Sequence, residues 1–316
     1  MHLKPVPPFE PVQTDRLPAG GSWIAQIKWD GVRMLTYYDG GATRLVNRRL
    51  NDRTAQYPEF THAPDIVSAG SVILDGEFIA FNHARPSFHE IMRRDSLRKA
   101  DGIRRAIDAV PVTYMVFDVL FANGRWTTEL PLRERQTLLS ELLRPHPQVQ
   151  AVTNMSEPDA LFDVMRTHGM EGVVAKDLDS VYAIGGKDKR WQKKKVIRDL
   201  TATVGGVTIR DGTVNALLLG LYDETGDLHY IGHAGAGKLT YADYRALTEE
   251  LPALGAPKSP FRNRAERERE AVWIRPGERA VKVHYLEWTD GGTLRQPVLQ
   301  AFIDAASADC TFGQLK

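Results

Sequence analysis

The hexapeptide Lys28-Trp29-Asp30-Gly31-Val32-Arg33 is the most informative stretch of this 316-residue chain. It follows the pattern K-x-D-G-x-R, which brings a lysine amine, a carboxylate, a glycine and an arginine close together. A lysine amine is almost entirely protonated at neutral pH, so nearby cations, desolvation or a metal must favour its neutral form before it can act as a nucleophile. The neighbouring side chains suit a phosphate-bearing substrate. Taken alone, the hexapeptide is also compatible with a surface turn.

Length and composition are those of a soluble globular protein with room for two domains. The hydrophobic fraction is 42% and the charged fraction is 26%. The chain contains no run of about 18 apolar residues, so no membrane span is predicted, and its start lacks the apolar segment of a secretory signal. The single cysteine, Cys310, cannot form an internal disulfide, which favours a reducing cytoplasm. No Cys/His cluster has the spacing of a zinc site.

The net charge of +1 does not indicate a nucleic-acid partner, but the distribution of charge does. Seven cations lie within residues 187–198, and six more lie within residues 93–105. Runs of this kind can follow a phosphate backbone. A solvated helix face is the alternative interpretation of each run.

Hydrophobic patterning predicts a mixed α+β region before residue 198. A Pro-rich, extended lead-in covers residues 1–20, and Gly76 indicates a bulge or a close approach within its strand. One helix is expected at 132–143, and a second helix is expected to begin with a capping box formed by Ser156 and Asp159. The expected strands are 25–28, 33–38, 71–81, 112–120 and 172–175.

The pattern changes to short strands separated by Asp-Gly and Gly-Asp turns after residue 200. A single helix is expected at 241–251. Five short strands and one helix suit a small barrel such as the OB-fold. The expected strands are 201–209, 216–222, 228–232, 280–288 and 293–302.

Five further segments follow the hexapeptide in a fixed order. They are Asn-Arg-Arg at 47–49, Leu-Asp-Gly-Glu-Phe at 74–78, Val-Phe-Asp-Val-Leu at 116–120, Glu-Gly-Val-Val-Ala-Lys at 171–176 and Trp-Gln-Lys-Lys-Lys at 191–195. In this order, ahead of a β-rich region, the segments resemble the covalent nucleotidyltransferase superfamily and most closely its ATP-dependent DNA ligases. The segments 232–237, 259–261, 287–291 and 294–297 resemble the OB domain of bacterial ligase D-type end-joining ligases and their small stand-alone relatives.

The resemblance implies an α+β fold with two domains. Residues 1–198 would form an adenylyltransferase domain, an ATP-grasp-like nucleotidyltransferase core of antiparallel sheets with helices. Residues 199–316 would form a C-terminal OB-fold β-barrel. Only 27 residues precede Lys28, so we expect a minimal ligase that grips DNA with these two domains alone.

The resemblance also implies which residues carry the chemistry. Lys28 would attack the α-phosphate of ATP and carry AMP through a phosphoramide bond. Asp30 and Arg33 would position phosphate and the nick. Lys193 and Lys195 would neutralise the α-phosphate and the departing charge, because phosphoryl transfer depends mainly on positioning and charge compensation.

Further residues would bind the nucleotide and a metal ion. Phe117 would stack on adenine, Arg48 would contact a phosphate or the ribose, and Arg295 lies where the last ligase motif engages pyrophosphate. Glu77 would bind a ribose hydroxyl or a metal, and Glu171 would share the metal, since carboxylates suit Mg²⁺ or Mn²⁺. The implied nucleotide-binding set is Gln26, Lys28, Arg33, Arg48, Glu77, Phe117, Lys193, Lys195 and Arg295.

Some residues have simpler alternatives. Phe117 lies in an apolar strand and could be a core residue, and Trp191 could pack beside the basic run. Gln26 stands two positions before the nucleophile, where these ligases often have Glu; an amide can accept a hydrogen bond from the adenine amino group, but it lacks the charge. Lys176 is left out of the expected site.

The expected function is therefore that of an ATP-dependent DNA ligase, which seals 5′-phosphate/3′-hydroxyl nicks in duplex DNA during repair, end joining included, through a lysyl-AMP intermediate. The expected cofactors are ATP and Mg²⁺ or Mn²⁺. The expected partners are nicked double-stranded DNA and other DNA repair proteins, for a monomer located in the bacterial cytoplasm at the nucleoid and not at a membrane. Two alternatives stay open, an RNA ligase or capping-type guanylyltransferase, and a non-catalytic DNA-end-binding module.

Overall fold

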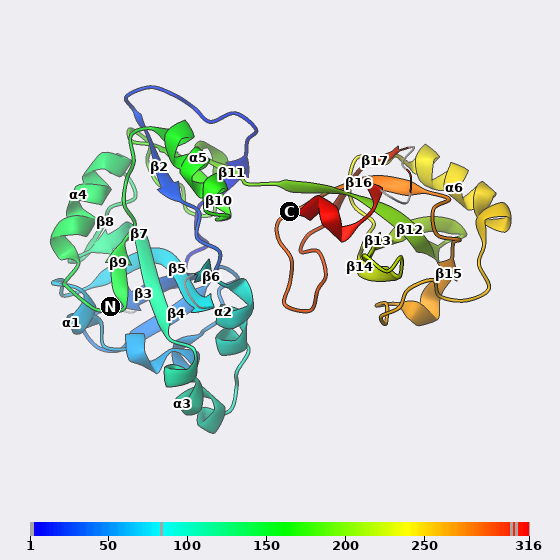
Figure 1. Cartoon of the computed structure of the whole chain (residues 1–316). Helices are drawn as coiled ribbons and strands as arrows, with labels where there is room; N and C mark the ends of the chain where they lie inside the picture. The colour runs from blue at the N-terminus through cyan, green and yellow to red at the C-terminus, as the bar shows by residue number, and fades with distance from the viewer. Residues whose placement is uncertain (1–2, 83–84, 304–305, 307–308, 316) are drawn as a thin grey trace. The chain divides into compact units, whose positions relative to one another are not determined.

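The computed structural model describes residues 3–82, 85–303, 306 and 309–315, and the chain divides into two compact units, Met1–Val196 and Ile197–Lys316. Figure 1 shows the first unit in blue to green and the second in green to red. Residues 1–2 and 316, at the ends of the two expected domains, lie outside the described residues.

The first unit contains a large, mainly antiparallel sheet in the order β4-β3-β5-β7-β8, with β6 paired to β5 and β9 parallel to β7. Its longest strands are almost continuously buried because both faces of the sheet are covered. The strands are β3 (Val32–Tyr38), β4 (Thr43–Asn47), β5 (Val72–Asn82), β6 (Arg85–Pro86), β7 (Val112–Ala122), β8 (Arg125–Trp126) and β9 (Val149–Ala151).

A glycine explains one irregularity of this sheet. The β5–β7 register shifts between Asp75 and Gly76, which leaves Phe117 of β7 as a bulged residue. A Cβ atom on Gly76 would lie 2.5 Å from the Tyr114 ring and 2.6 Å from the Met115 carbonyl oxygen, so no larger residue fits. The bulge expected at Gly76 is confirmed, and it re-aims the Phe117 side chain.

The second sheet of this unit has the order β1-β11-β10-β2. The basic run from residue 187 forms strand β11, so the alternative of a solvated helix face was wrong for this run. Trp191, at the middle of the strand, is only 2% exposed, whereas Lys187 and Lys189 are exposed and the other side chains are half-buried. The strands are β1 (Glu10–Gln13), β2 (Trp23–Ile27), β10 (Gly172–Asp177) and β11 (Lys187–Lys195).

Helices cover the sheets of the first unit. The expected helix 132–143 is present as α4, but the capping box at Ser156 was wrong. Helix α5 begins at Pro158 with Glu157 as its N-cap residue, because proline favours the first helical position, and no side chain caps it. The helices are η1 (Thr54–Gln56), η2 (Pro58–Phe60), α1 (Ala63–Ile66), α2 (Phe88–Asp95), α3 (Ala100–Ala109), α4 (Leu132–Leu142) and α5 (Pro158–Thr167).

The second unit is a curved antiparallel sheet in the order β14-β13-β12-β16-β17, with β15 paired to β12. A bridge between Gly237 and Leu299 joins its two outer edges, and Lys238 donates its backbone N–H to the Leu299 carbonyl at 2.7 Å. The sheet therefore closes as a small barrel. Its strands are β12 (Arg198–Arg210), β13 (Thr213–Tyr222), β14 (Leu228–Ala234), β15 (Ala271–Trp273), β16 (Ala280–Tyr285) and β17 (Val298–Ile303).

Helix α6 (Tyr241–Leu254) begins with a capping box between Thr240 and Asp243 and packs on the barrel. The expected strand 280–288 ends at Tyr285, and the expected strand 293–302 begins only at Val298. The intervening residues form a turn closed by the Thr289 N–H and the Thr293 carbonyl at 2.8 Å. The described residues of this unit also form the short helices η3 (Glu268–Glu270) and η5 (Phe312–Leu315).

The α+β prediction is confirmed, with antiparallel sheets in the first unit and a β-barrel in the second. Within the part of the chain that the structure describes, no helix is both long and apolar enough to cross a membrane.

Candidate active site

The first unit contains a cavity of about 810 Å³ between residues of its two sheets. Across the smaller sheet, Gln26, Val174 and Lys193 pair side by side, so their side chains share one face, and all three line the cavity. From the larger sheet come side chains of β3, β5 and β7. The sequence-predicted site residues that line the cavity are Gln26, Lys28, Arg33, Arg48, Glu77, Phe117 and Lys193.

Lys28 follows β2 directly and is anchored by its backbone N–H, which donates to the Gly172 carbonyl at 2.9 Å. Its Nζ lies 2.6 Å from Glu171 Oε2, and the other oxygen of that carboxylate lies 3.3 Å from Lys195 Nζ. Gly31 permits the tight path of the turn, since a Cβ there would lie 2.1 Å from the Phe78 carbonyl oxygen. One carboxylate thus holds both the candidate nucleophile and a second lysine.

Glu77 lies on β5 beside Arg33 of β3 and faces the cavity. Burial raises the pKa of Glu77 to about 8; the positive charges of Lys28 and Arg33 act in the opposite direction, and Glu171 and Asp30 add repulsion. A carboxylate that is buried without full neutralisation suits a cationic ligand.

The donor set fits a divalent cation only in part. Glu77 and Glu171 are hard oxygen donors close enough to influence each other's charge. Among the described residues, however, no group of three or more His, Cys, Asp or Glu side chains could hold a metal ion. A cation held by these two carboxylates would complete its coordination with substrate phosphate oxygens and water, which is the usual arrangement for Mg²⁺.

Arg33 is held rigidly in place. Its Nε and Nη2 each donate to a different oxygen of Asp75 at 2.6 Å, and Nη2 also donates to the Phe9 carbonyl at 3.0 Å. Burial opposes the charge of Arg33, but Asp75 outweighs that effect and raises its pKa. The guanidinium carbon lies 4.7 Å from the centre of the Phe117 ring. Phe117 and Trp191 both line the cavity, and we refer to them as its aromatic wall. Arg33 supports this wall with three of its five N–H groups already used.

Lys176 belongs to this wall although sequence reasoning left it out. Its Nζ lies 4.3 Å from the Phe117 ring centre and 3.9 Å from that of Trp191. The residue is 2% exposed, and Nζ has no hydrogen-bond partner. Burial lowers the pKa of Lys176 to about 7, although Asp118 partly opposes the shift. Its place two residues after Val174 on β10 was the available signal, because alternate residues of a strand share a face.

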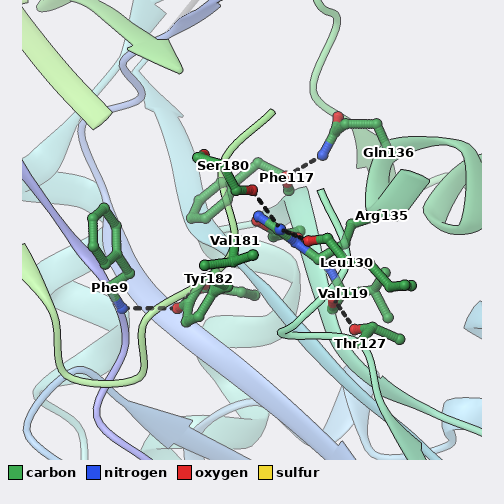
Figure 2. Close-up of polar contacts among 12 residues, drawn as sticks. Phe9, Phe117, Val119, Thr127, Leu130, Arg135, Gln136, Ser180, Val181 and Tyr182 are labelled. Atoms are coloured by element: carbon green, nitrogen blue, oxygen red, sulfur yellow. Dashed lines mark hydrogen bonds and ion pairs between the residues drawn. The ribbon is translucent and has the colours of Figure 1, made fainter. Parts of the chain in front are cut away.

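A buried polar layer lies behind the aromatic wall. Figure 2 shows Arg135, whose Nη1 donates to the carbonyls of Leu130 at 2.7 Å and Ser180 at 3.1 Å. Its Nε donates to Asp118 Oδ1 at 2.8 Å, and both side chains are fully buried. The Tyr182 hydroxyl accepts from the Phe9 N–H at 2.9 Å (Figure 2). These contacts fix the strands that carry Phe117 and Arg33.

Of the other predicted site residues, Lys193 lines the cavity, whereas Asp30, Glu171, Lys195 and Arg295 do not. Burial lowers the pKa of Lys193, and the charges of Lys28 and Lys195 lower it further, as expected for a cluster of cations. Asp30, Glu171 and Lys195 are not among the lining residues; Glu171 and Lys195 join the site through Lys28. Arg295 lies in the second unit, where it donates to Glu287 at 2.6 Å.

Both units match models of known protein families. The model described as ATP dependent DNA ligase domain matches residues 12–195, and the model described as ATP dependent DNA ligase C terminal region matches residues 210–303. The chain is thus of the nucleotidyltransferase class. It belongs to the ATP-dependent DNA ligase family, which confirms the resemblance inferred from its motifs.

Curated relatives cover most of this chain. It is 30% identical over 307 residues to a DNA ligase of Caldivirga maquilingensis, covering 87% of this chain and 50% of that protein. It is 31% identical over 288 residues to the multifunctional non-homologous end joining DNA repair protein LigD of Mycobacterium tuberculosis, covering 87% of this chain and 35% of that protein. The chain therefore spans half or less of the length of these curated relatives.

Solved structures share the fold. A mycobacterial DNA ligase D complexed with ATP and MES has a TM-score of 0.53 and 28% identity, with 98% of this chain and 99% of that chain covered. A Lig E DNA ligase has a TM-score of 0.60 at 17% identity, with 93% of this chain and 99% of that chain covered. The second likeness concerns the fold alone.

Proposed function

We propose that this chain is an ATP-dependent DNA ligase that joins a 5′-phosphate to a 3′-hydroxyl at nicks in duplex DNA. The single observation that carries the proposal is the position of Lys28 in a cavity that also presents Lys193, Arg48 and an aromatic wall, with the Lys28 amine held 2.6 Å from Glu171. A nucleophilic amine, clustered cations and a stacking surface are the parts that transfer of a nucleotidyl group requires.

The side chains divide the work of the first step. The Lys28 amine attacks the α-phosphorus of ATP, a nitrogen–phosphorus bond forms, and the bond to pyrophosphate breaks. Glu171 is the group nearest to take up the proton that the amine loses. Lys193 and Lys195 stabilise the charge that develops on the phosphate oxygens, and Phe117 stacks on the base.

A divalent cation, Mg²⁺ or Mn²⁺, fits Glu77 and Glu171. When bound there, it would supply charge compensation to the phosphates of the nucleotide. Asp30 belongs to the same charged group, because its carboxylate adds to the repulsion at Glu77.

The later steps use DNA. AMP passes from Lys28 to the 5′-phosphate, and the 3′-hydroxyl then displaces AMP as the nick is sealed. We assign residues 1–198 to the nucleotidyltransferase domain and 199–316 to the OB-fold domain, in which Arg295 would engage pyrophosphate. The proposed setting is DNA repair, end joining included, by a cytoplasmic monomer that meets nicked DNA and other repair proteins.

Intact mass after incubation with ATP and Mg²⁺, without DNA, tests the proposal. The parent chain should gain the mass of one AMP, and the Lys28→Ala chain should gain none. No gain with ATP, GTP or Mn²⁺, after pyrophosphate treatment to remove any AMP already attached, would refute it and favour a DNA-binding module. Comparing nicked DNA with nicked RNA then separates DNA joining from RNA joining.

A further inference from the structure

Three side-chain amides connect the two sides of the cavity. Gln26 of β2 donates from Nε2 to Asn154 Oδ1 at 2.7 Å, and Asn154 donates from Nδ2 to Gln136 Oε1 at 3.0 Å. Gln136 of α4 donates from Nε2 to the backbone carbonyl of Phe117 at 2.8 Å. Gln26 is 2% exposed, yet it lines the cavity. We refer to these three side chains as the amide relay.

The Phe117 carbonyl fixes the direction of the whole amide relay. A carbonyl oxygen only accepts hydrogen bonds, so Gln136 must present its nitrogen to Phe117 and its oxygen to Asn154. Asn154 must then present its nitrogen to Gln136 and its oxygen to Gln26. Gln26 can meet that oxygen only with Nε2, and a 180° flip of any one amide would bring two acceptors or two donors together.

The consequence is that Gln26 keeps its oxygen for the cavity. Gln26 Nε2 donates to Asn154 Oδ1 at 2.7 Å and, over a longer distance of 3.4 Å, to Gln136 Oε1. Among the hydrogen bonds of the described residues, none is donated to Gln26 Oε1. The ring of Phe117 lines the same cavity. A purine stacked on that ring would thus meet an acceptor of fixed orientation. That orientation is set, through the amide relay, by the backbone carbonyl of Phe117 itself.

We propose that Asn154 and Gln136 are positioning residues that set nucleobase specificity, because they hold Gln26 so that Oε1 accepts from a 6-amino purine and rejects a 6-oxo purine. The inference rests on the proposed function and names the base that the site selects. A freely rotating glutamine would offer Nε2 to a 6-oxo group as readily as it offers Oε1 to a 6-amino group. Discrimination therefore comes from the amide relay and not from Gln26 alone.

ATP and inosine triphosphate (ITP) provide the direct comparison, since ITP carries an oxygen in place of the 6-amino group. The rate of nucleotidyl-lysine formation is followed by intact mass. In the parent chain it should favour ATP by on the order of 10- to 100-fold, because with ITP the 6-oxo group and Gln26 Oε1 are two acceptors that face each other without a proton between them. In Asn154→Ala only the long bond from Gln26 Nε2 to Gln136 Oε1, at 3.4 Å, still orients the amide. The ratio should therefore fall towards one, mainly because ITP reacts faster.

Two variants distinguish positioning from a general structural role. Asn154→Asp loses the donation to Gln136 Oε1 but still accepts from Gln26 Nε2, so Gln26 Oε1 should stay turned to the cavity and most of the preference for ATP should remain. Gln150→Ala, an exposed side chain on β9, is the matched control and should behave as the parent. An unchanged ATP-to-ITP ratio in Asn154→Ala, or an equal loss of that ratio in Asn154→Asp, would overturn the proposal.

Binding separates this inference from the proposed function. Calorimetric titration of Lys28→Ala with AMP and IMP measures base preference without any covalent step. If the parent chain forms no nucleotidyl-lysine, the proposed function fails. The amide relay is still supported if Lys28→Ala prefers AMP over IMP and the Lys28→Ala, Asn154→Ala double variant does not. Equal affinity for AMP and IMP before and after that change would refute it.

Discussion

Replacing Lys176 by methionine should stabilise the first unit at neutral pH. Burial lowers the pKa of Lys176 to about 7 from its ordinary value of 10.5. The unfolded chain therefore binds a proton up to about pH 10.5, whereas the folded chain releases it near pH 7. This difference corresponds to about 4 kcal/mol of lost stability at pH 7 and about 2 kcal/mol at pH 9.

Methionine is an unbranched side chain one atom shorter than lysine, and it has no charge to bury. The lost cation–π contacts with Phe117 and Trp191 would offset about 1–2 kcal/mol of the gain. Net stabilisation at pH 7 should thus be roughly 2–3 kcal/mol, and the advantage should shrink by about 2 kcal/mol between pH 7 and pH 9. The parent becomes more stable relative to the variant as pH rises, because the unfolded state alone stays protonated.

Urea unfolding at both pH values, followed by tryptophan fluorescence, measures the effect. Trp191 packs against Lys176 and reports on the first unit, while unfolding of the second unit serves as an internal reference. Lys189→Met, an exposed position on the same sheet, should change stability by less than about 0.5 kcal/mol. A Lys176→Met variant that is less stable than the parent at pH 7, or a difference independent of pH, would refute the reasoning.

Three other substitutions test the site. Gly172→Ala should abolish AMP attachment measured by intact mass, because a Cβ there would lie 2.1 Å from a backbone oxygen of β11 at a φ of +142°, whereas Gly21→Ala, with open space around it, should be silent. Asp118→Asn should cost about 3–5 kcal/mol in chemical unfolding, since its buried arginine partner loses its counter-charge; a cost below 1 kcal/mol would contradict this. Glu171→Gln should slow AMP attachment to Lys28 on the order of 100-fold in a mass time course, and a rate equal to the parent's would exclude Glu171 as proton acceptor.

Local patterns in the sequence were sufficient where the physics is local. The spacing of apolar residues in β5 and β7 predicted both strands. The internal Gly76 predicted the bulge, because a glycine within an apolar strand can be read directly from the sequence. The K-x-D-G-x-R motif likewise identified the turn that presents Lys28. Helix α5 was placed correctly along the chain, although its first residue was not, since Pro158 outweighed the capping signal of Ser156.

The roles of individual side chains depended on contacts between distant segments. The Asp75 carboxylate holds Arg33 against the Phe117 ring, a contact between segments that lie far apart along the chain. The basic run could be a helix or a strand until its pairing with β1 and β10 was known. Lys176 is the last residue of the motif at 171–176, but its burial against the rings of Phe117 and Trp191 is visible only in the folded chain.

By itself, the sequence determined the family, the order of the motifs and the identity of the candidate nucleophile, since these depend on residue types in a linear order. Only the tertiary structure decided which way Gln26 points. Its partners lie 110 and 128 positions away along the chain, on α4 and in the segment before α5. The Phe117 carbonyl orients Gln136, which orients Asn154, which in turn orients Gln26. These hydrogen bonds can form only once the sheets and helices are packed together.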